Sequence, residues 1–114
     1  GKFTKYSGNM GYINKKINEN PEISLQIGKV YMTDFLRAFS HWVYYTSAQS
    51  MIVCDLQGVL DLEGRSPMFK LTDPAIVTKG RIYGKTDMGM KGIKMFCRKH
   101  KCNNVCKGLG LPPI

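Results

Sequence analysis

The sequence predicts one small domain that combines helices with short β-strands. Its 114 residues give it the length of a single domain, too short for two. Hydrophobic residues make up 43% of the chain and charged residues 22%, which is typical of a globular protein. Helical and strand-like hydrophobic patterns occur in separate segments. We therefore expect a mixed fold around one core.

The first third of the chain predicts a strand, a connection and a helix. Residues 2–6 alternate loosely between polar and apolar side chains, which predicts a strand. Residues 14–30 are polar and contain Pro21 and Gly28, so we expect an exposed connection there. A helix is predicted over residues 33–45, capped by its first Thr or Asp and packed on the core by a recurring apolar face. The residues of this face are Phe35, Ala38, Phe39, Trp42 and Val43.

Residues 50–57 predict a buried strand, because the segment is rich in β-formers and mostly apolar on both faces. Side chains alternate along a strand, so Asp55 and Gln57 would point the same way at its end. We expect a long loop over residues 58–74 and a glycine-containing turn over residues 84–89. Two polar groups would thus leave the sheet together.

Two helices are predicted towards the C-terminal end. Residues 90–100 form an amphipathic helix whose apolar face carries His100. A short helix follows, with Cys102 and Cys106 one turn apart, and glycines and prolines end it.

Seventeen Lys and Arg residues against eight Asp and Glu give a formal net charge of +9, which favours anionic partners. The densest basic patch, residues 91–107, is short and has no aromatic signature of RNA binding, so a nucleic-acid partner rests on charge alone and is disfavoured. No apolar run approaches the roughly 18 residues that a membrane span needs.

The four cysteines could form two disulfides in a secreted protein. However, Cys54 lies in an apolar run and Cys97 in an amphipathic helix, where a free cysteine serves as a small core residue. We therefore expect reduced cysteines and an intracellular, cytoplasmic protein.

The motif His100-x-Cys102-x₃-Cys106 predicts a metal site. The two cysteines would share a helix face, and His100 precedes them closely enough to converge on the same point. Such ligands suit tetrahedral Zn²⁺. The fourth ligand could be either cysteine assigned to the core or His41, and we favour His41, the other histidine of the chain. A closed site of this kind serves folding, whereas the alternative is a core histidine beside two free thiols.

Asp55, Gln57 and Asp73 form a second group of candidate residues. Oxygen ligands at a strand end suit Mg²⁺ that also contacts phosphates, and Gly58 allows close approach of backbone. Asp73, within Thr72-Asp73-Pro74, could orient a hydroxyl nucleophile or accept its proton. Each residue alone also fits a turn or cap.

In combination, these motifs resemble the C-terminal half of the catalytic domain of the alpha-kinases, a family of atypical protein kinases. The resemblance covers nearly the whole chain, and the combination is specific although no single motif is. The motifs are Lys5-Tyr6 with Asn9-x-Gly11, Ala38-Phe39-Ser40-His41-Trp42, Asp55-Leu56-Gln57-Gly58-Val59, Leu71-Thr72-Asp73-Pro74, Gly84-x₄-Gly89 and His100-x-Cys102-x₃-Cys106.

The resemblance implies an α+β, two-lobed kinase fold in which residues 1–114 are the C-terminal lobe, a small mixed sheet with helices held by structural zinc. It implies transfer of the γ-phosphoryl group of ATP to Ser or Thr of a protein substrate. The N-terminal lobe, with its ATP-binding lysine, would belong to a longer parent chain. We therefore expect residues 1–114 alone to be inactive.

The family pattern also implies residue roles. Asp55 and Gln57 would hold Mg²⁺ and the ATP phosphates, with Asn9 near the nucleotide, and Asp73 would act at the substrate hydroxyl. The substrate-binding residues would be Thr72, Gly84 and Gly89, and the zinc ligands His41, His100, Cys102 and Cys106.

The sequence departs from the family pattern in one place that bears on activity. An insert around residues 62–70 lengthens the connection between Asp55 and Asp73. Phosphoryl transfer depends on positioning, so a longer connection could displace a carboxylate, or it could bulge into solvent. The alternative function is therefore a zinc-stabilised pseudokinase or interaction module. Smaller departures are Ser7 and Gly8 in place of asparagines, Leu60 in place of glycine and Thr86 in place of alanine.

Overall fold

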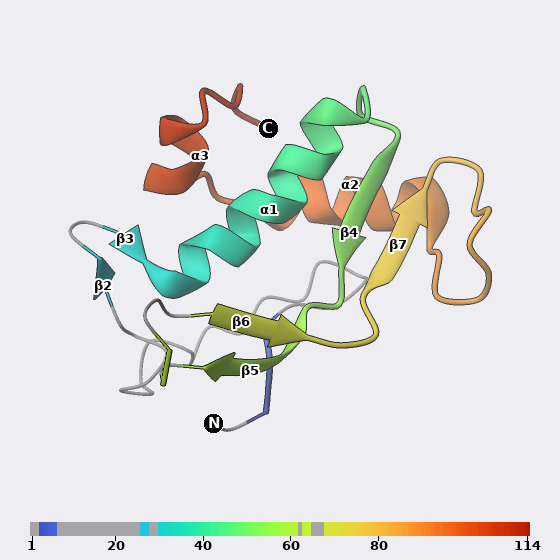
Figure 1. Cartoon of the computed structure of the whole chain (residues 1–114). Helices are drawn as coiled ribbons and strands as arrows, with labels where there is room; N and C mark the ends of the chain where they lie inside the picture. Colours follow the sequence, from blue (N-terminus) through green and yellow to red (C-terminus); the bar gives the residue numbers. More distant parts are fainter. Residues whose placement is uncertain (1–2, 7–25, 28–29, 62, 65–67) are drawn as a thin grey trace.

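The fold is known from a computed structural model, in which the strands form small antiparallel sheets and three helices lie beside them (Figure 1). It describes residues 3–6, 26–27, 30–61, 63–64 and 68–114. Asn9, expected near the nucleotide, lies outside the described residues, as does most of the predicted connection over residues 14–30.

Seven strands are present in the described part of the chain. The first strand, β1 (Thr4–Lys5), confirms the strand predicted over residues 2–6. It pairs with β5 (Gln57–Asp61), which also pairs with β6 (Met68–Leu71). A second pair consists of β4 (Met51–Cys54) and β7 (Ala75–Thr78). The third pair, β2 (Gln26–Ile27) and β3 (Val30–Tyr31), falls inside the predicted connection, so that prediction is wrong at these residues.

The strand predicted over residues 50–57 is broken at Asp55. Strand β4 ends at Cys54, and Asp55 takes a left-handed backbone conformation with φ of 56°. This conformation turns the chain, so that β4 and β5 belong to different sheets (Figure 1). Asp55 and Gln57 therefore do not share the face of one strand, and that prediction is wrong.

The loop predicted over residues 58–74 is largely a β-hairpin. Strands β5 and β6 pair antiparallel, from Gly58 opposite Leu71 to Asp61 opposite Met68. Side chains of β5 alternate between half-buried and buried, as expected for a strand with one face on a core. The backbone of β6 passes so close to Gly58 that a Cβ there would lie 2.0 Å from the carbonyl oxygen of Lys70. The predicted close backbone approach at Gly58 is thus confirmed.

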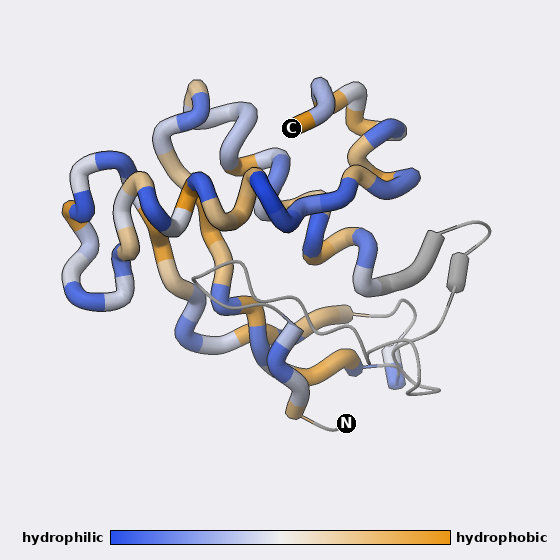
Figure 2. The backbone as a smooth tube through the Cα atoms, turned by 180° about the vertical axis from the view of Figure 1, so that it is seen from behind, coloured by the Kyte–Doolittle hydropathy of each residue, from blue (hydrophilic) through white to orange (hydrophobic). Residues whose placement is uncertain are grey.

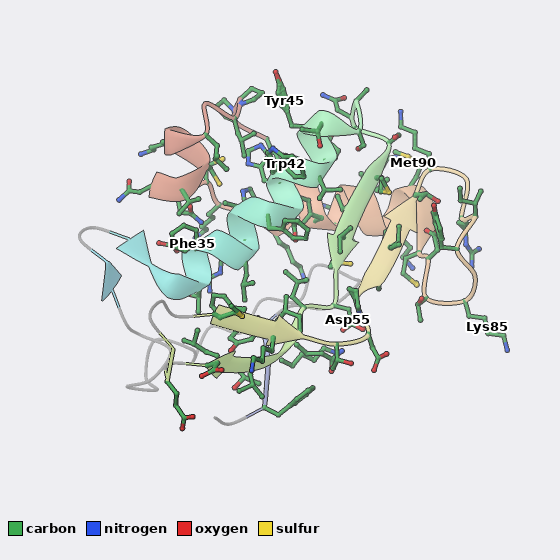
Figure 3. All side chains as sticks on the ribbon, in the orientation of Figure 1. Phe35, Trp42, Tyr45, Asp55, Lys85 and Met90 are labelled. Atoms are coloured by element: carbon green, nitrogen blue, oxygen red, sulfur yellow. The ribbon has the colours of Figure 1, made fainter. Side chains whose placement is uncertain are left out.

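Helix α1 (Met32–Thr46) confirms the first predicted helix but buries a different face. Ala38 and Val43 are buried as expected, whereas Phe35, Phe39 and Trp42 are 43%, 40% and 45% exposed. Figure 3 labels Phe35 and Trp42 on this helix. The helix starts at Met32, so the predicted capping Thr lies inside the first turn.

The side of α1 that packs on the strands includes Val43 of the predicted face, together with Leu36 and Ser40. These three residues are buried, and the Ser40 hydroxyl donates a 2.7 Å hydrogen bond to the carbonyl oxygen of Val53. A polar residue is thus accommodated at the contact between α1 and β4 because its hydroxyl finds a partner there.

Buried side chains form two clusters in the described residues, where the sequence predicted one core. Helix α1 reaches both, with Leu36 in the first and Tyr44 packed against the second. Cys54 and Ile93 are members of the second cluster, and Cys97 packs against it. The first cluster consists of Tyr6, Leu36, Leu56 and Leu60, and the second of Ile52, Cys54, Ala75, Val77 and Ile93.

The two C-terminal helices are α2 (Gly89–Lys99) and α3 (Asn104–Gly108), close to their predicted positions. Helix α2 packs on β7 and α3 packs on α1. Among the described residues, no helix is long and apolar enough to cross a membrane.

Candidate active site and metal centre

A group of potential metal ligands gathers where the three helices meet. One ligand atom from each of four residues lies within 4.8 Å of all the others; the residues are His41, His100, Cys102 and Cys106. They come from α1, the end of α2, the α2–α3 connection and α3. The four residues predicted from the sequence are therefore brought together. The rejected alternatives, Cys54 and Cys97, lie outside the group.

The hydrogen bonds of His41 orient its ring for metal binding. Its Nε2 lies 2.9 Å from the carbonyl oxygen of Pro112, and since a carbonyl only accepts, Nε2 carries the proton. The lone pair of Nδ1 then faces the Cys102 sulfur at 3.6 Å. A metal-ligating histidine commonly donates its second ring N–H in this way.

Burial keeps both imidazoles in the neutral form that binds metals. Burial, helped by the nearby charges of His41 and Arg37, lowers the pKa of His100 to about 4. The pKa of His41 is also lowered by burial, although its hydrogen bond to Pro112 opposes the change. Burial raises the pKa of the Cys106 thiol, so a cation is needed to favour its thiolate. This donor set fits Zn²⁺.

Asn103 positions Cys106, and the sequence interpretation missed it. Its side-chain oxygen accepts hydrogen bonds from the backbone N–H groups of Val105 and Cys106, and its amide nitrogen donates to the carbonyl oxygen of Asp34. Asn103 is therefore the N-cap of α3, which leaves Cys102 before the helix rather than one turn from Cys106 within it. An asparagine ahead of a short helix was the signal available in the sequence.

Asp55 and Asp73 lie at one junction between the sheets. Asp55 connects β4 to β5, and Asp73 connects β6 to β7; Figure 3 shows Asp55 at this place. The pairing of Cys54 with Ala75 holds the β4 and β7 ends of the two connections side by side. On the hairpin side, the N–H of Thr72 donates a 3.0 Å hydrogen bond to the carbonyl oxygen of Gln57. The two connections are thus tied together at both ends.

Both aspartates have left-handed backbone, with φ of 56° at Asp55 and 49° at Asp73. This conformation is uncommon for residues other than glycine, and residues held in it cluster at active sites. Asp73 is exposed, whereas Asp55 is half-buried and its Oδ1 is enclosed. The Lys5 ammonium nitrogen lies 3.1 Å from that oxygen. The junction therefore offers one half-buried carboxylate, paired with Lys5, and one exposed carboxylate.

The glycine-containing turn is held by Asp87, a second residue that the sequence interpretation missed. Gly84 and Gly89 have positive φ of 90° and 63°, as their turn positions predicted. The fully buried Asp87 carboxylate accepts hydrogen bonds from the backbone and hydroxyl of Thr78 and from the N–H groups of Tyr83 and Gly89. Although burial opposes its charge, these hydrogen bonds hold the pKa of Asp87 at about 2. An aspartate between two turn glycines was the available signal.

Comparison with known proteins identifies the family of this chain. Residues 1–106 match the Alpha-kinase family, and the chain belongs to it. The chain is 36% identical over 112 residues to alpha-protein kinase vwkA of Dictyostelium discoideum. It is 34% identical over 115 residues to eukaryotic elongation factor 2 kinase of Mus musculus. These matches take in 97% and 100% of the chain but only 15% and 13% of the relatives.

Solved alpha-kinase structures have the same fold. An alpha kinase from Entamoeba histolytica superposes with a TM-score of 0.76 at 34% identity, covering 100% of this chain and 37% of the other. The alpha-kinase domain of myosin-II heavy chain kinase A in complex with AMP-PNP superposes with a TM-score of 0.74 at 31% identity, covering 100% and 35%. The α+β, alpha-kinase fold implied by the sequence is thus confirmed over about a third of such a domain.

Proposed function

We propose that residues 1–114 form the C-terminal part of an alpha-type protein kinase domain, which transfers the γ-phosphoryl group of ATP to Ser or Thr of protein substrates. The observation that carries this proposal is the junction where Asp55 and Asp73, both with left-handed backbone, lie on two connections tied together. Family membership and the related kinase domain bound to AMP-PNP support it. Four free cysteines are compatible with an intracellular location.

In this proposal, Asp55 and Gln57 hold Mg²⁺ and the ATP phosphates, and Asn9 contributes near the nucleotide. The enclosed Oδ1 of Asp55, which already lies beside the Lys5 cation, fits a ligand atom for a hard cation. Bound Mg²⁺ would neutralise charge on the phosphates. The Lys5 ammonium group, close to the same oxygen, would interact with the negative charge of the Asp55 carboxylate together with Mg²⁺.

Asp73 is exposed and is therefore accessible to a substrate hydroxyl. It would accept the proton while the hydroxyl oxygen bonds to the γ-phosphorus and the bond from that phosphorus to the β–γ bridging oxygen breaks, releasing ADP. Thr72 and the segment from Gly84 to Gly89 would contact the substrate chain.

We further propose that His41, His100, Cys102 and Cys106 bind one structural Zn²⁺. The donor set has two imidazoles and two thiols, and the hydrogen bond from His41 to Pro112 leaves Nδ1 free to bind. The ion would join the three helices and stabilise the fold.

The decisive experiment uses a chain that contains both kinase lobes, assayed for transfer from labelled ATP to protein. Asp73→Ala should lower the rate by about 10²- to 10⁴-fold, the usual contribution of a general base. Asp61→Ala, which removes a carboxylate from the far end of strand β5, is the matched control and should retain activity. Transfer that survives Asp73→Ala would refute the proposed role of Asp73. A native two-lobed chain that shows no transfer at all would instead favour a zinc-stabilised module without catalysis.

A further inference from the structure

Positive charge is concentrated in the C-terminal part of the chain. Residues 74–114 contain nine Lys and Arg against a single acidic residue, Asp87, whereas residues 1–73 contain eight against seven. Asp87 is fully buried and hydrogen-bonded, so it faces none of these cations at the surface. Figure 2 views the molecule from the side on which α2 lies and shows hydrophilic segments recurring along this helix.

Some of these cations border a groove with an apolar lining. The groove has a volume of about 410 Å³ and lies between α2, the end of β7 and the last turn of α1. Lys94 and Arg98 lie one turn apart on α2, and Lys79 follows β7. In the described part of the chain, no carboxylate lies within salt-bridge distance of these three exposed cations. The apolar side chains that line the groove include Tyr44, Met90 and Ile93.

We propose that this groove binds an acidic protein segment that carries an apolar side chain. Carboxylates of the segment would pair with Lys79, Lys94 and Arg98, and the apolar side chain would lie against Met90 and Ile93. Opposite charge steers and orients a partner, while burial of an apolar group supplies affinity. The surface goes beyond the proposed kinase chemistry, because neither Asp55 nor Asp73 lines it.

The combination of charge and apolar lining favours an acidic peptide over two other anionic partners, a nucleic acid and a membrane surface. A nucleic acid would use the cations through its phosphates without needing an apolar anchor. A membrane surface is broad, and its attraction would extend to exposed cations outside the groove, such as Lys91 and Lys99. A peptide segment can satisfy both features of a confined groove.

The test is a binding measurement on the full chain by fluorescence anisotropy. The probe is a short labelled peptide of Asp and Glu with one central Leu, and a second peptide has Ser in place of Leu. The variant Lys94→Glu with Arg98→Glu should weaken binding of the Leu peptide by about tenfold or more. The matched control, Lys91→Glu with Lys99→Glu, makes the same charge change on the same helix outside the groove and should weaken it by less than about threefold.

Two further comparisons test the apolar half of the site. Met90→Ser should weaken binding of the Leu peptide but leave binding of the Ser peptide unchanged, since Met90 is partly exposed and uncharged. Equal loss of affinity in the groove and control variants would overturn the proposal, as would equal affinity for the two peptides or no binding of the Leu peptide. Tighter binding of a single-stranded oligonucleotide or of phosphatidylserine vesicles would assign the charge to nucleic acid or membrane.

Discussion

The proposed metal site places two of its candidate ligand residues in almost complete burial. His41 is 1% and Cys106 0% exposed, and a buried polar group is costly unless it is paired. His41 has the Pro112 carbonyl on one side, whereas its Nδ1 faces only sulfur. A bound cation would convert this cost into folding free energy, because the unfolded chain cannot assemble the four ligands.

Substitution at Cys106 should therefore reduce both zinc content and stability. Cys106→Ser should lose the bound ion and lower the free energy of unfolding by about 3 kcal/mol or more, because it removes a ligand and leaves a buried polar group. Cys97→Ser is the control, since Cys97 packs against the core and should leave one zinc per chain. Metal analysis and urea unfolding measure both quantities. Full zinc content in Cys106→Ser would refute the assignment.

The buried carboxylate of Asp87 holds the glycine-containing turn through its charge. Asp87→Asn should lower the free energy of unfolding by about 2–3 kcal/mol, because hydrogen bonds to a charged group are lost and the new amide N–H atoms face other donors. Asp61→Asn removes a half-buried carboxylate whose ion-pair partner, Lys70, is exposed, and it should change stability by less than about 1 kcal/mol. Urea unfolding at neutral pH tests the pair; equal stability of the two variants would contradict the role of Asp87.

The same carboxylate predicts a pH dependence. The pKa of Asp87 is about 2 in the folded chain, below its ordinary value of 3.8. The unfolded chain therefore binds this proton at a higher pH than the native chain, and the stabilisation is present above about pH 4 and lost towards pH 2. The stability difference between the native protein and Asp87→Asn should shrink over this window, and loss of metal affects both proteins alike. A difference that stays constant down to pH 2 would contradict the prediction.

At the scale of the elements, α1 shows what a periodic pattern can and cannot specify. The spacing of apolar residues predicted the helix correctly but selected the stripe with Phe35, Phe39 and Trp42, which is largely exposed. Two polar residues outside that stripe, Ser40 and His41, are buried although they look less suited to a core. Their burial depends on the Val53 carbonyl and on the metal-binding group, partners from distant segments that local periodicity cannot reveal.

The strands were harder to predict than the helices for a related reason. The left-handed conformation of Asp55 divides one apparent strand into β4 and β5, and nothing in the local composition marks it. Gly64 and Pro67 suggested a loop where β5 and β6 pair, because pairing depends on the partner strand. Helices α2 and α3 make local hydrogen bonds, so local signals predicted that both exist, although the start of α3 was placed too early, ahead of Cys102.

Asn103 should stabilise α3 through its capping oxygen and the α1–α3 contact through its amide. Asn103→Ala removes both hydrogen-bonding groups and should lower the free energy of unfolding by about 1–2 kcal/mol. Asn103→Asp keeps the oxygen that caps α3 but cannot donate to the Asp34 carbonyl. It should therefore lower the free energy of unfolding by less than Asn103→Ala does, through the α1–α3 contact alone. Thermal unfolding of the zinc-loaded chain measures the difference. Equal stability of native protein and Asn103→Ala would show that the cap contributes nothing.

At the scale of the whole molecule, the two sites differ in how far sequence alone predicted them. The metal group followed from ligand types and one motif, since only His41 remained as a second imidazole. Asp55 and Asp73 were identified as candidates, but their meeting depends on the β4–β7 pairing and on the β5–β6 hairpin, neither of which was predicted. Residues 68–70 of the insert belong to strand β6 of this hairpin.

The hairpin register predicts that the insert does not separate the aspartates. Asp61 pairs with Met68, so residues 62–67 can be replaced by a two-residue Asn-Gly turn without moving the strands. The hydrogen bond from the Thr72 N–H to the Gln57 carbonyl oxygen should remain. A two-lobed chain with this replacement should therefore keep its phosphoryl-transfer rate within about threefold of the native rate. Transfer from labelled ATP to protein measures it.

Deletion of Lys70 is the informative counterpart, because it shortens the hairpin within β6 instead of beyond its paired end. A one-residue shift in the register of β6 turns its side chains to the opposite face. Either Phe69 then loses its packing against the first cluster, or Thr72 loses its hydrogen bond to Gln57. We expect this variant to lose phosphoryl transfer while the distant zinc group still binds its ion. If the turn replacement abolishes transfer in a folded chain, the insert itself contributes to catalysis and register alone does not position Asp73.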